Sequence, residues 1–211
     1  MNVLGHTHVA LAGGRDDPEY LLGAVLPDLA AMAGIRVTGA AFAGALAAGI
    51  RSHHRTDAAF HAHPDFVSGS GALRRALVER DLALGPARAV GHAGWELLLD
   101  GTLVGTEVEG ALGRAIAVGD RAAAGLAPAA RDRWAAFLHR ARRAPGPRYD
   151  DPAWVADRLH AMLERRPRLR LPVGQVATVA GVLASHAAEV AGCASRVLDD
   201  TTRAVAVTPV R

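Results

Sequence analysis

The chain has 211 residues, 50% of them apolar but only 4% aromatic, which suits one domain with a core of Ala, Leu and Val. All 24 basic residues are arginines, and a formal net charge of +3 is too small to indicate nucleic-acid binding by itself. The single cysteine, Cys193, excludes an internal disulfide framework and favours a reducing compartment.

The first residues contain no basic segment followed by an apolar run, so the sequence shows no signal peptide. The most apolar stretches, residues 21–33 and 37–50, are interrupted before reaching the roughly 18 to 20 apolar residues that a bilayer span needs. We therefore expect a soluble, cytoplasmic protein with no membrane span and no nucleic-acid partner. The sequence does not indicate an oligomeric state.

Helical signals run along the chain, whereas alternating strand patterns are nearly absent. Pro18 can open a helix with apolar residues at helical spacing. Thr38 can cap an alanine-rich helix from Ala40 towards His63, which Pro64 would end. Further helices are predicted over residues 71–83, 86–103, 107–124, 128–143, 151–165 and 173–200.

These patterns predict an all-α fold. The turns between the predicted helices carry Pro or Gly, and Pro145-Gly146-Pro147 is the best candidate for a flexible loop. Because that loop is too short to separate two domains, we expect residues 1–211 to form a single compact multi-helix domain.

Most of the histidines lie before residue 97, in clusters that each include an acid. On a helix, His53, Asp57 and His61 lie on one face, because they are spaced four residues apart. Imidazole and carboxylate together suit Mn, Fe or Zn better than Ca. The alternative is a solvated polar face, and the triplet alone does not decide between them.

His92 and Glu96 repeat this spacing, and Trp95 and the adjacent leucines place them against an apolar surface. A charge near the core is costly unless it is paired or bound to a metal, which favours ligands. Asp28 ends an apolar run and needs a metal or an arginine partner for the same reason.

His6 and His8 complete the candidate ligands. Side chains two residues apart on a helix diverge, so we expect only one of this pair to face the others. A metal ion or a pair of metal ions held by these residues would activate water, and Asp28 or Asp57 could act as the catalytic base. The predicted metal ligands are His6, His8, Asp28, His53, Asp57, His61, His92 and Glu96.

A basic run in the last third of the chain could bind an acidic partner. The alternative is an exposed helix end whose arginines complement the helix dipole. The residues concerned are Arg165, Arg166, Arg168 and Arg170.

Several segments resemble one family in the same order along the chain. The opening Met-Asn-Val-Leu-Gly-His-Thr-His is similar to Met-Asn-x-Leu-x-His-x-His. The segment ending at Asp28 resembles Gly-x-Leu-Leu-x-Asp, and the one ending at Asp57 resembles Gly-Ile-x-x-His-Arg-x-Ile-Asp. The helix around Trp95 resembles Asp-x-x-Trp-Asp, and Arg165 begins an Arg-Arg-Pro-Arg-Leu motif. Together these motifs resemble bacterial acyl carrier protein phosphodiesterases, over most of the chain.

The resemblance implies a fold related to HD-domain metal phosphohydrolases. It also implies removal of the 4′-phosphopantetheine arm from holo-acyl carrier protein with a divalent metal, typically Mn²⁺. By position, Asp28 would be the essential carboxylate, with His53 and Asp57 at the metal. The chain departs from the family at His61 and His92, where the family has acids, and this departure favours Zn or Fe.

Other functions stay open at this point. The same scaffold could carry a phosphohydrolase for nucleotides or phospholipids, or a di-iron oxygenase. A non-catalytic, metal-stabilised protein that binds an acidic partner is a further alternative. Acids beyond four tetrahedral ligands argue against a closed structural zinc site.

Overall fold

The computed structural model describes residues 1–207, in which all regular structure is helical, so the all-α prediction is confirmed. The last four residues of the predicted domain, 208–211, lie outside the described residues. The α-helices are α1 (Val3–Ala12), α2 (Pro18–Met32), α3 (Gly44–His61), α4 (Pro64–Val78), α5 (Leu84–Gly101), α6 (Glu107–Ala117), α7 (Pro128–Ala141), α8 (Pro152–Leu163) and α9 (Val176–Val207). Short 3-10 helices are η1 (Gly39–Ala41), η2 (Gly119–Gly125) and η3 (Val173–Gln175).

Local sequence explains where several helices begin. The side chains of Asp17, His63, Thr106 and Asp151 each accept a hydrogen bond from a backbone N–H of the following first turn. Such caps satisfy donors that have no partner inside the helix. In α2, α4 and α8 a proline follows the cap, and its fixed φ suits the first helical position.

Three predicted boundaries are wrong. The helix predicted over 71–83 begins at Pro64, because this proline opens α4 as well as ending the helix before it. The helix predicted over 107–124 is divided into α6 and η2. Thr38 makes no side-chain cap, and it precedes η1 rather than α3, which begins at Gly44 with a left-handed φ of 61°.

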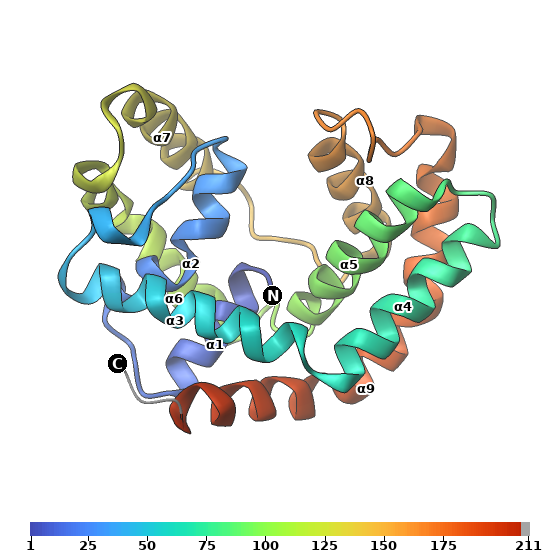
Figure 1. Ribbon diagram of the computed structural model, residues 1–211, viewed down its shortest axis with the longest axis horizontal. Helices are drawn as coiled ribbons and strands as arrows, with labels where there is room; N and C mark the ends of the chain where they lie inside the picture. The colour runs from blue at the N-terminus through green and yellow to red at the C-terminus, as the bar shows by residue number, and fades with distance from the viewer. Residues whose placement is uncertain (208–211) are drawn as a thin grey trace. The chain divides into compact units, whose positions relative to one another are not determined.

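Contacts divide the described chain into two compact units, each assembled from separate stretches (Figure 1). Unit 1 comprises Met1–Phe60, Gly105–Gly146 and the chain from Leu198 onward, and unit 2 comprises His61–Val104 and Pro147–Val197. One boundary therefore falls within the Pro-Gly-Pro loop that the sequence marks as flexible. The single domain over residues 1–211 stays a prediction.

In unit 1, helices α1, α2 and α6 pack against one another, and α3 crosses α2 at very close range (Figure 1). A Cβ at Gly49 would lie 2.2 Å from the carbonyl oxygen of Tyr20, and one at Gly23 would lie 2.2 Å from that of Leu46. Only glycine permits this approach of the two backbones. The crossing brings the polar residues of α3 close to α2.

In unit 2, α4 and α5 run side by side, and α5 also packs on α8 (Figure 1). The indole of Trp95 lies over Gly69 of α4, where a Cβ would approach Nε1 to 2.3 Å. Gly94, on the same helix, receives the side chains of Leu159 and Leu183. Glycine thus sets the spacing of α5 against its neighbours, and this fixes where the polar side of α5 lies.

The span Val173–Val207, which contains α9, is long and apolar enough to cross a membrane by length and composition, although no span was expected from the sequence. Core helices of soluble proteins meet the same criterion, but those are mostly buried, whereas only 22% of the most apolar 18-residue window of this span is buried. The buried residues of α9 include Val179, Val182, Val190 and Val197, which recur at helical spacing on one face. One face of α9 therefore packs against the protein, and most of the apolar window is not buried.

Candidate metal centres

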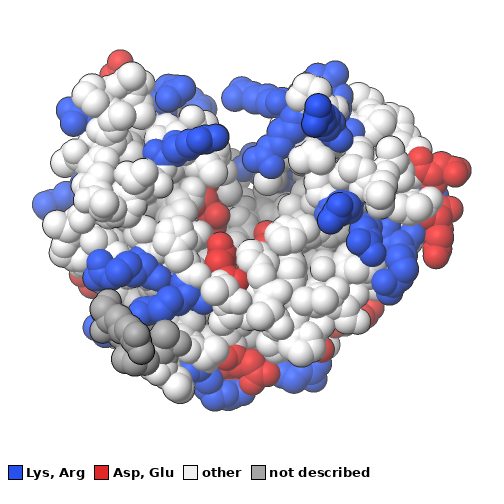
Figure 2. Space-filling view, viewed as in Figure 1, with Lys and Arg blue, Asp and Glu red and all other residues white. Residues whose placement is uncertain are grey.

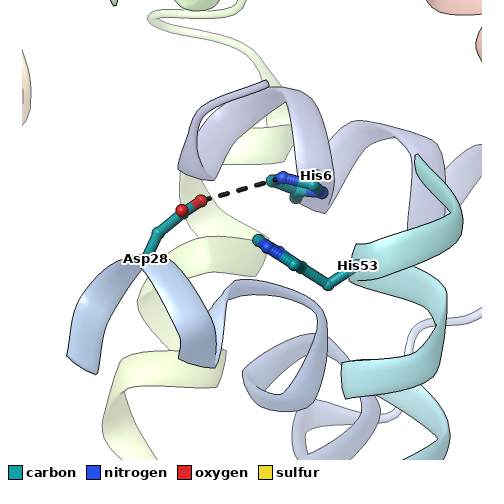
Figure 3. Close-up of side chains that lie close together, drawn as sticks. All are labelled: His6, Asp28 and His53. Atoms are coloured by element: carbon teal, nitrogen blue, oxygen red, sulfur yellow. Dashed lines mark ion pairs between the residues drawn. The ribbon is translucent and has the colours of Figure 1, made fainter. Parts of the chain in front are cut away.

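The first group of candidate ligands lies inside unit 1 and is called here the unit 1 cluster: His6, Asp28, His53 and Asp57. His6 comes from α1, Asp28 from α2 and His53 from α3 (Figure 3). Asp57 also belongs to α3. His6 Nε2 lies 3.2 Å from Oδ1 of Asp57 and 3.7 Å from Oδ2 of Asp28. His53 Nε2 lies 3.4 Å from Oδ2 of Asp57, and the two imidazole rings stack with centroids 4.0 Å apart.

A backbone contact fixes the tautomer of His53. Its Nδ1 lies 2.9 Å from the carbonyl oxygen of Ala24 and must carry a proton, since a carbonyl oxygen only accepts. In the neutral ring, Nε2 then presents a lone pair towards the carboxylate of Asp57. This arrangement needs a cation between the two groups, either a proton or a metal ion, and resembles the way proteins orient metal-binding histidines.

Burial and charge shift the pKa values of this cluster in opposite directions. Burial lowers the pKa of His6 to about 4, although the Asp57 carboxylate partly offsets it. Burial also lowers the pKa of His53, but hydrogen bonding to Asp57 and the nearby charge of Asp28 outweigh it, and the net pKa is raised. Burial raises the pKa of Asp57, yet the hydrogen bonds from His53 and His6 hold it well below its usual range.

The unit 1 cluster is buried on its imidazole side and open on its carboxylate side. The His6 side chain is 0% exposed, whereas those of Asp28 and Asp57 are 27% and 30% exposed. The α-amino group of Met1 also donates to Asp57 Oδ1 at 3.1 Å. Ligand atoms of His6, Asp28 and His53 all lie within 4.8 Å of one another, so they could hold one metal ion.

A second group, called here the unit 2 cluster, consists of His61, His92 and Glu96. Glu96 Oε1 lies 3.0 Å from Nε2 of His61 and 3.2 Å from Nε2 of His92. Burial raises the pKa of Glu96, but the hydrogen bonds from both histidines outweigh it and lower the pKa strongly. The three ligand atoms lie within 4.8 Å of one another, so this cluster could also hold a metal ion.

Aromatic packing positions the unit 2 cluster. The ring of Phe66 lies 5.2 Å from that of His61, 5.1 Å from that of His92 and 5.4 Å from that of Trp95, centroid to centroid. Phe66 is buried and belongs to α4, whose close approach to α5 is set by Gly69. Phe66 therefore contacts both imidazoles, that of His92 on α5 and that of His61 at the end of α3.

The predicted ligands fall into these two groups rather than one. His61 does not join His53 and Asp57, because a separation of eight residues from His53 spans about 12 Å along a helix. It pairs instead with Glu96 in unit 2. His8 belongs to neither group: it is half-buried, and burial lowers its pKa despite the charges of Asp199 and Glu107.

The arginine run follows α8, and Arg165, Arg166, Arg168 and Arg170 are all exposed. Figure 2 shows arginines gathered over α8 and the loop that follows it. Arg170 donates to the carbonyl oxygen of Glu164, next to the C-terminal end of α8, as expected for a side chain that caps a helix.

Sequence reasoning missed three arginines near the unit 2 cluster. Arg74, Arg75 and Arg88 line a cavity of about 380 Å³ together with Phe66 and His92. Arg88, His92 and Glu96 are spaced four residues apart on one helix, and this spacing predicts that Arg88 lies beside His92. The two arginines of α4 could not be placed without the packing of α4 on α5.

No protein-family model matches the chain, and neither a curated protein nor a solved structure matches it. The assignment of the two clusters therefore rests on the residues and their geometry. The resemblance to acyl carrier protein phosphodiesterases, including the relation to HD-domain proteins, stays a prediction.

Proposed function

We propose that the unit 1 cluster holds a divalent metal ion and hydrolyses a phosphodiester. One observation carries this proposal: the Nε2 lone pair of His53, set by the Ala24 carbonyl, points at a carboxylate that also meets His6. Two imidazoles and two carboxylates suit manganese, iron or zinc, and manganese is the first to test because of the family resemblance. When bound, the metal would activate water and neutralise phosphoryl charge.

The exposure of the cluster supports an enzyme more than a structural metal site. A structural zinc site closes all positions with protein ligands, whereas a catalytic site leaves a position for water or substrate. Here the carboxylate side of the cluster is open to solvent, and the imidazole side is buried. Substrate would approach Asp28 and Asp57 from the open side.

The two carboxylates suit different tasks. Asp57 lies 3.2 Å from Nε2 of His6 and 3.4 Å from Nε2 of His53, and its pKa is strongly lowered, so it is a poor base and serves to orient the imidazoles. Asp28 would bind the metal through one carboxylate oxygen, and its other oxygen is the proposed base. It takes a proton from the attacking water as the new phosphorus–oxygen bond forms. The bond from phosphorus to the leaving oxygen then breaks, and that oxygen receives the proton.

Holo-acyl carrier protein is the proposed substrate, in which the leaving oxygen belongs to the serine that bears 4′-phosphopantetheine. The products are the free serine hydroxyl and a phosphomonoester. Two features support this choice: the ordered motifs from residue 1 to about 170, and the exposed arginines Arg165, Arg166 and Arg168, which suit an acidic partner.

The first test measures hydrolysis of bis(p-nitrophenyl) phosphate with added Mn²⁺. Asp28→Asn keeps the size of the side chain but removes the base, and we expect a loss of roughly 100-fold or more in kcat. Asp132→Asn, an exposed substitution on α7, should keep the wild-type rate. Equal activity in wild type and Asp28→Asn would show that the unit 1 cluster is not the active site.

A second experiment distinguishes loss of hydrolysis from loss of carrier-protein binding. The double variant Arg165→Glu and Arg168→Glu should lose activity towards holo-acyl carrier protein while keeping hydrolysis of the small diester. Wild-type activity on the carrier protein should also fall with added salt, because exposed charges are screened. Unchanged activity of the double variant on the carrier protein would exclude these arginines as the docking site.

A further inference from the structure

The unit 2 cluster carries features of a binding site that does not depend on the proposed phosphodiesterase activity. Two imidazole Nε2 atoms meet the same oxygen of Glu96, which is only 14% exposed. His92 is 52% exposed and His61 is 36% exposed, so the histidines face solvent while the carboxylate does not. Two histidines and one glutamate are a known zinc ligand set that leaves a fourth position open.

The surroundings of His92 are strongly positive. The cavity of about 380 Å³ is lined by Arg74, Arg75 and Arg88, and no acidic residue lines it. Within residues 1–207, ion pairs join other arginines to acids, and none joins Arg74, Arg75 or Arg88 to a carboxylate. Figure 2 shows blue side chains over α4, the helix that carries two of them. Unpaired guanidinium groups in a concave surface favour a phosphate group, which they bind through paired hydrogen bonds.

A second cavity extends from the same residues over an apolar surface. Its volume is about 510 Å³, and it shares Arg88 and His92 with the first cavity. The rest of its wall includes Leu159, Met162 and Leu169 from α8 and the loop that follows it. Met162 is exposed although it is a large apolar side chain. An apolar group attached to the phosphate would find its contacts here.

We propose that His61, His92 and Glu96 hold a zinc ion, and that this ion and the neighbouring arginines bind the phosphate group of an ester with an apolar organic part. The charges of the zinc ion and the phosphate group make their binding interdependent. The single carboxylate of Glu96 cannot balance a divalent ion beside three guanidinium groups, so a phosphate dianion supplies the remaining negative charge. Zinc should therefore bind more tightly when phosphate is present, and by thermodynamic linkage phosphate should bind more tightly by the same factor when zinc is present.

The first experiment counts zinc ions by titration calorimetry of the full chain in a phosphate-free buffer. We expect two equivalents in wild type, one in the unit 1 cluster and one in the unit 2 cluster. His92→Gln and Glu96→Gln should each lose one equivalent, whereas the exposed substitution His139→Gln should lose none. His53→Gln should lose the other equivalent, so failure of one site is distinguishable from failure of the other.

The second experiment titrates inorganic phosphate and hexyl phosphate into the zinc-loaded protein. Hexyl phosphate should bind at least about tenfold more tightly, because its chain contacts the apolar wall. Arg88→Gln should weaken both phosphates about tenfold without changing the zinc count, and Arg133→Gln, on α7, should change neither.

Three results would overturn the proposal. An unchanged zinc count in both His92→Gln and Glu96→Gln would remove the zinc site. Phosphate affinity that is the same with and without zinc would remove the linkage. Equal affinity for inorganic phosphate and hexyl phosphate would show that free phosphate, and not an ester, is the ligand class.

Discussion

Asp57 lies between the imidazoles of His6 and His53, whose pKa values are shifted in opposite directions. Its carboxylate meets Nε2 of both His6 and His53, yet the pKa of His6 is lowered and that of His53 is raised. The difference arises because His6 is fully buried, whereas His53 also interacts with Asp28 and donates to the Ala24 carbonyl. In the metal-free protein His53 therefore holds a proton more tightly than His6 does, and His6 stays neutral near pH 7.

The lowered pKa of His6 makes stability depend on pH. The ordinary pKa is 6.5 and the folded value is about 4, so between these pH values the unfolded chain binds a proton that the folded chain does not. The free energy of unfolding should then decrease as the pH falls from 6.5 to 4, by about 3 kcal/mol in total. Urea unfolding of the metal-free protein across this range measures it.

His6→Gln removes the titrating group, so this share of the pH dependence should disappear, while His139→Gln should keep the wild-type slope. The raised pKa of His53 acts with the opposite sign: its contribution is present at low pH and lost as the pH rises through its folded pKa. A wild-type slope in His6→Gln would show that His6 titrates normally in the folded protein.

Some contacts between the site residues could be predicted from the sequence. The pairs His53 with Asp57 and His92 with Glu96 follow from a spacing of four residues on a helix. The contact of His6 with Asp57 could not be predicted from helical spacing, because it joins α1 to α3 across more than forty residues. Periodicity is a property of one helix and does not show which helices meet.

At the scale of the helices, glycine at the crossing of α2 and α3 positions the unit 1 cluster. The carbonyl of Ala24 on α2 accepts from His53 on α3, so any separation of the two helices breaks this contact. Gly49 lies at the crossing, where an added Cβ would come within 2.7 Å of the Ala24 nitrogen. The same packing thus supports both the core and the metal site.

Gly49→Ala should destabilise the protein by about 1–3 kcal/mol, because the added methyl group forces the α2 and α3 backbones apart. It should also weaken metal retention. Gly113→Ala is the control: no atom lies within 4 Å of its added Cβ, and alanine in α6 should stabilise the helix by up to about 1 kcal/mol. Urea unfolding of both variants checks this, and equal stability of the two would contradict the proposed role of the crossing.

Proline explains both the success and the error in predicting the helices. The helix from Pro18, and those predicted over 128–143 and 151–165, were found close to their observed ranges because a proline or a capping residue marks each start. The sequence misplaces the helix at 64–78, because Pro64 also predicts the end of the preceding helix. A proline that follows a capping side chain, here His63, also indicates a start.

For the whole molecule, the division into two units changes how the histidine clusters are interpreted. The sequence placed all candidate ligands in one site, but the two groups belong to different units. The boundary runs through α3 between Phe60 and His61, so one helix contributes to both clusters. Sequence could not show this division, because a continuous helix carries no signal where tertiary contacts change from one unit to the other.

Metal binding by the unit 1 cluster can be measured by elemental mass spectrometry of the protein expressed with Mn²⁺ in the medium, comparing wild type with Asp57→Asn and with the exposed control Asp132→Asn. We expect wild type and the control to retain the same amount of metal and Asp57→Asn to lose about one equivalent relative to both. The same metal content in all three proteins would show that this cluster binds no metal, as would no metal in any of them.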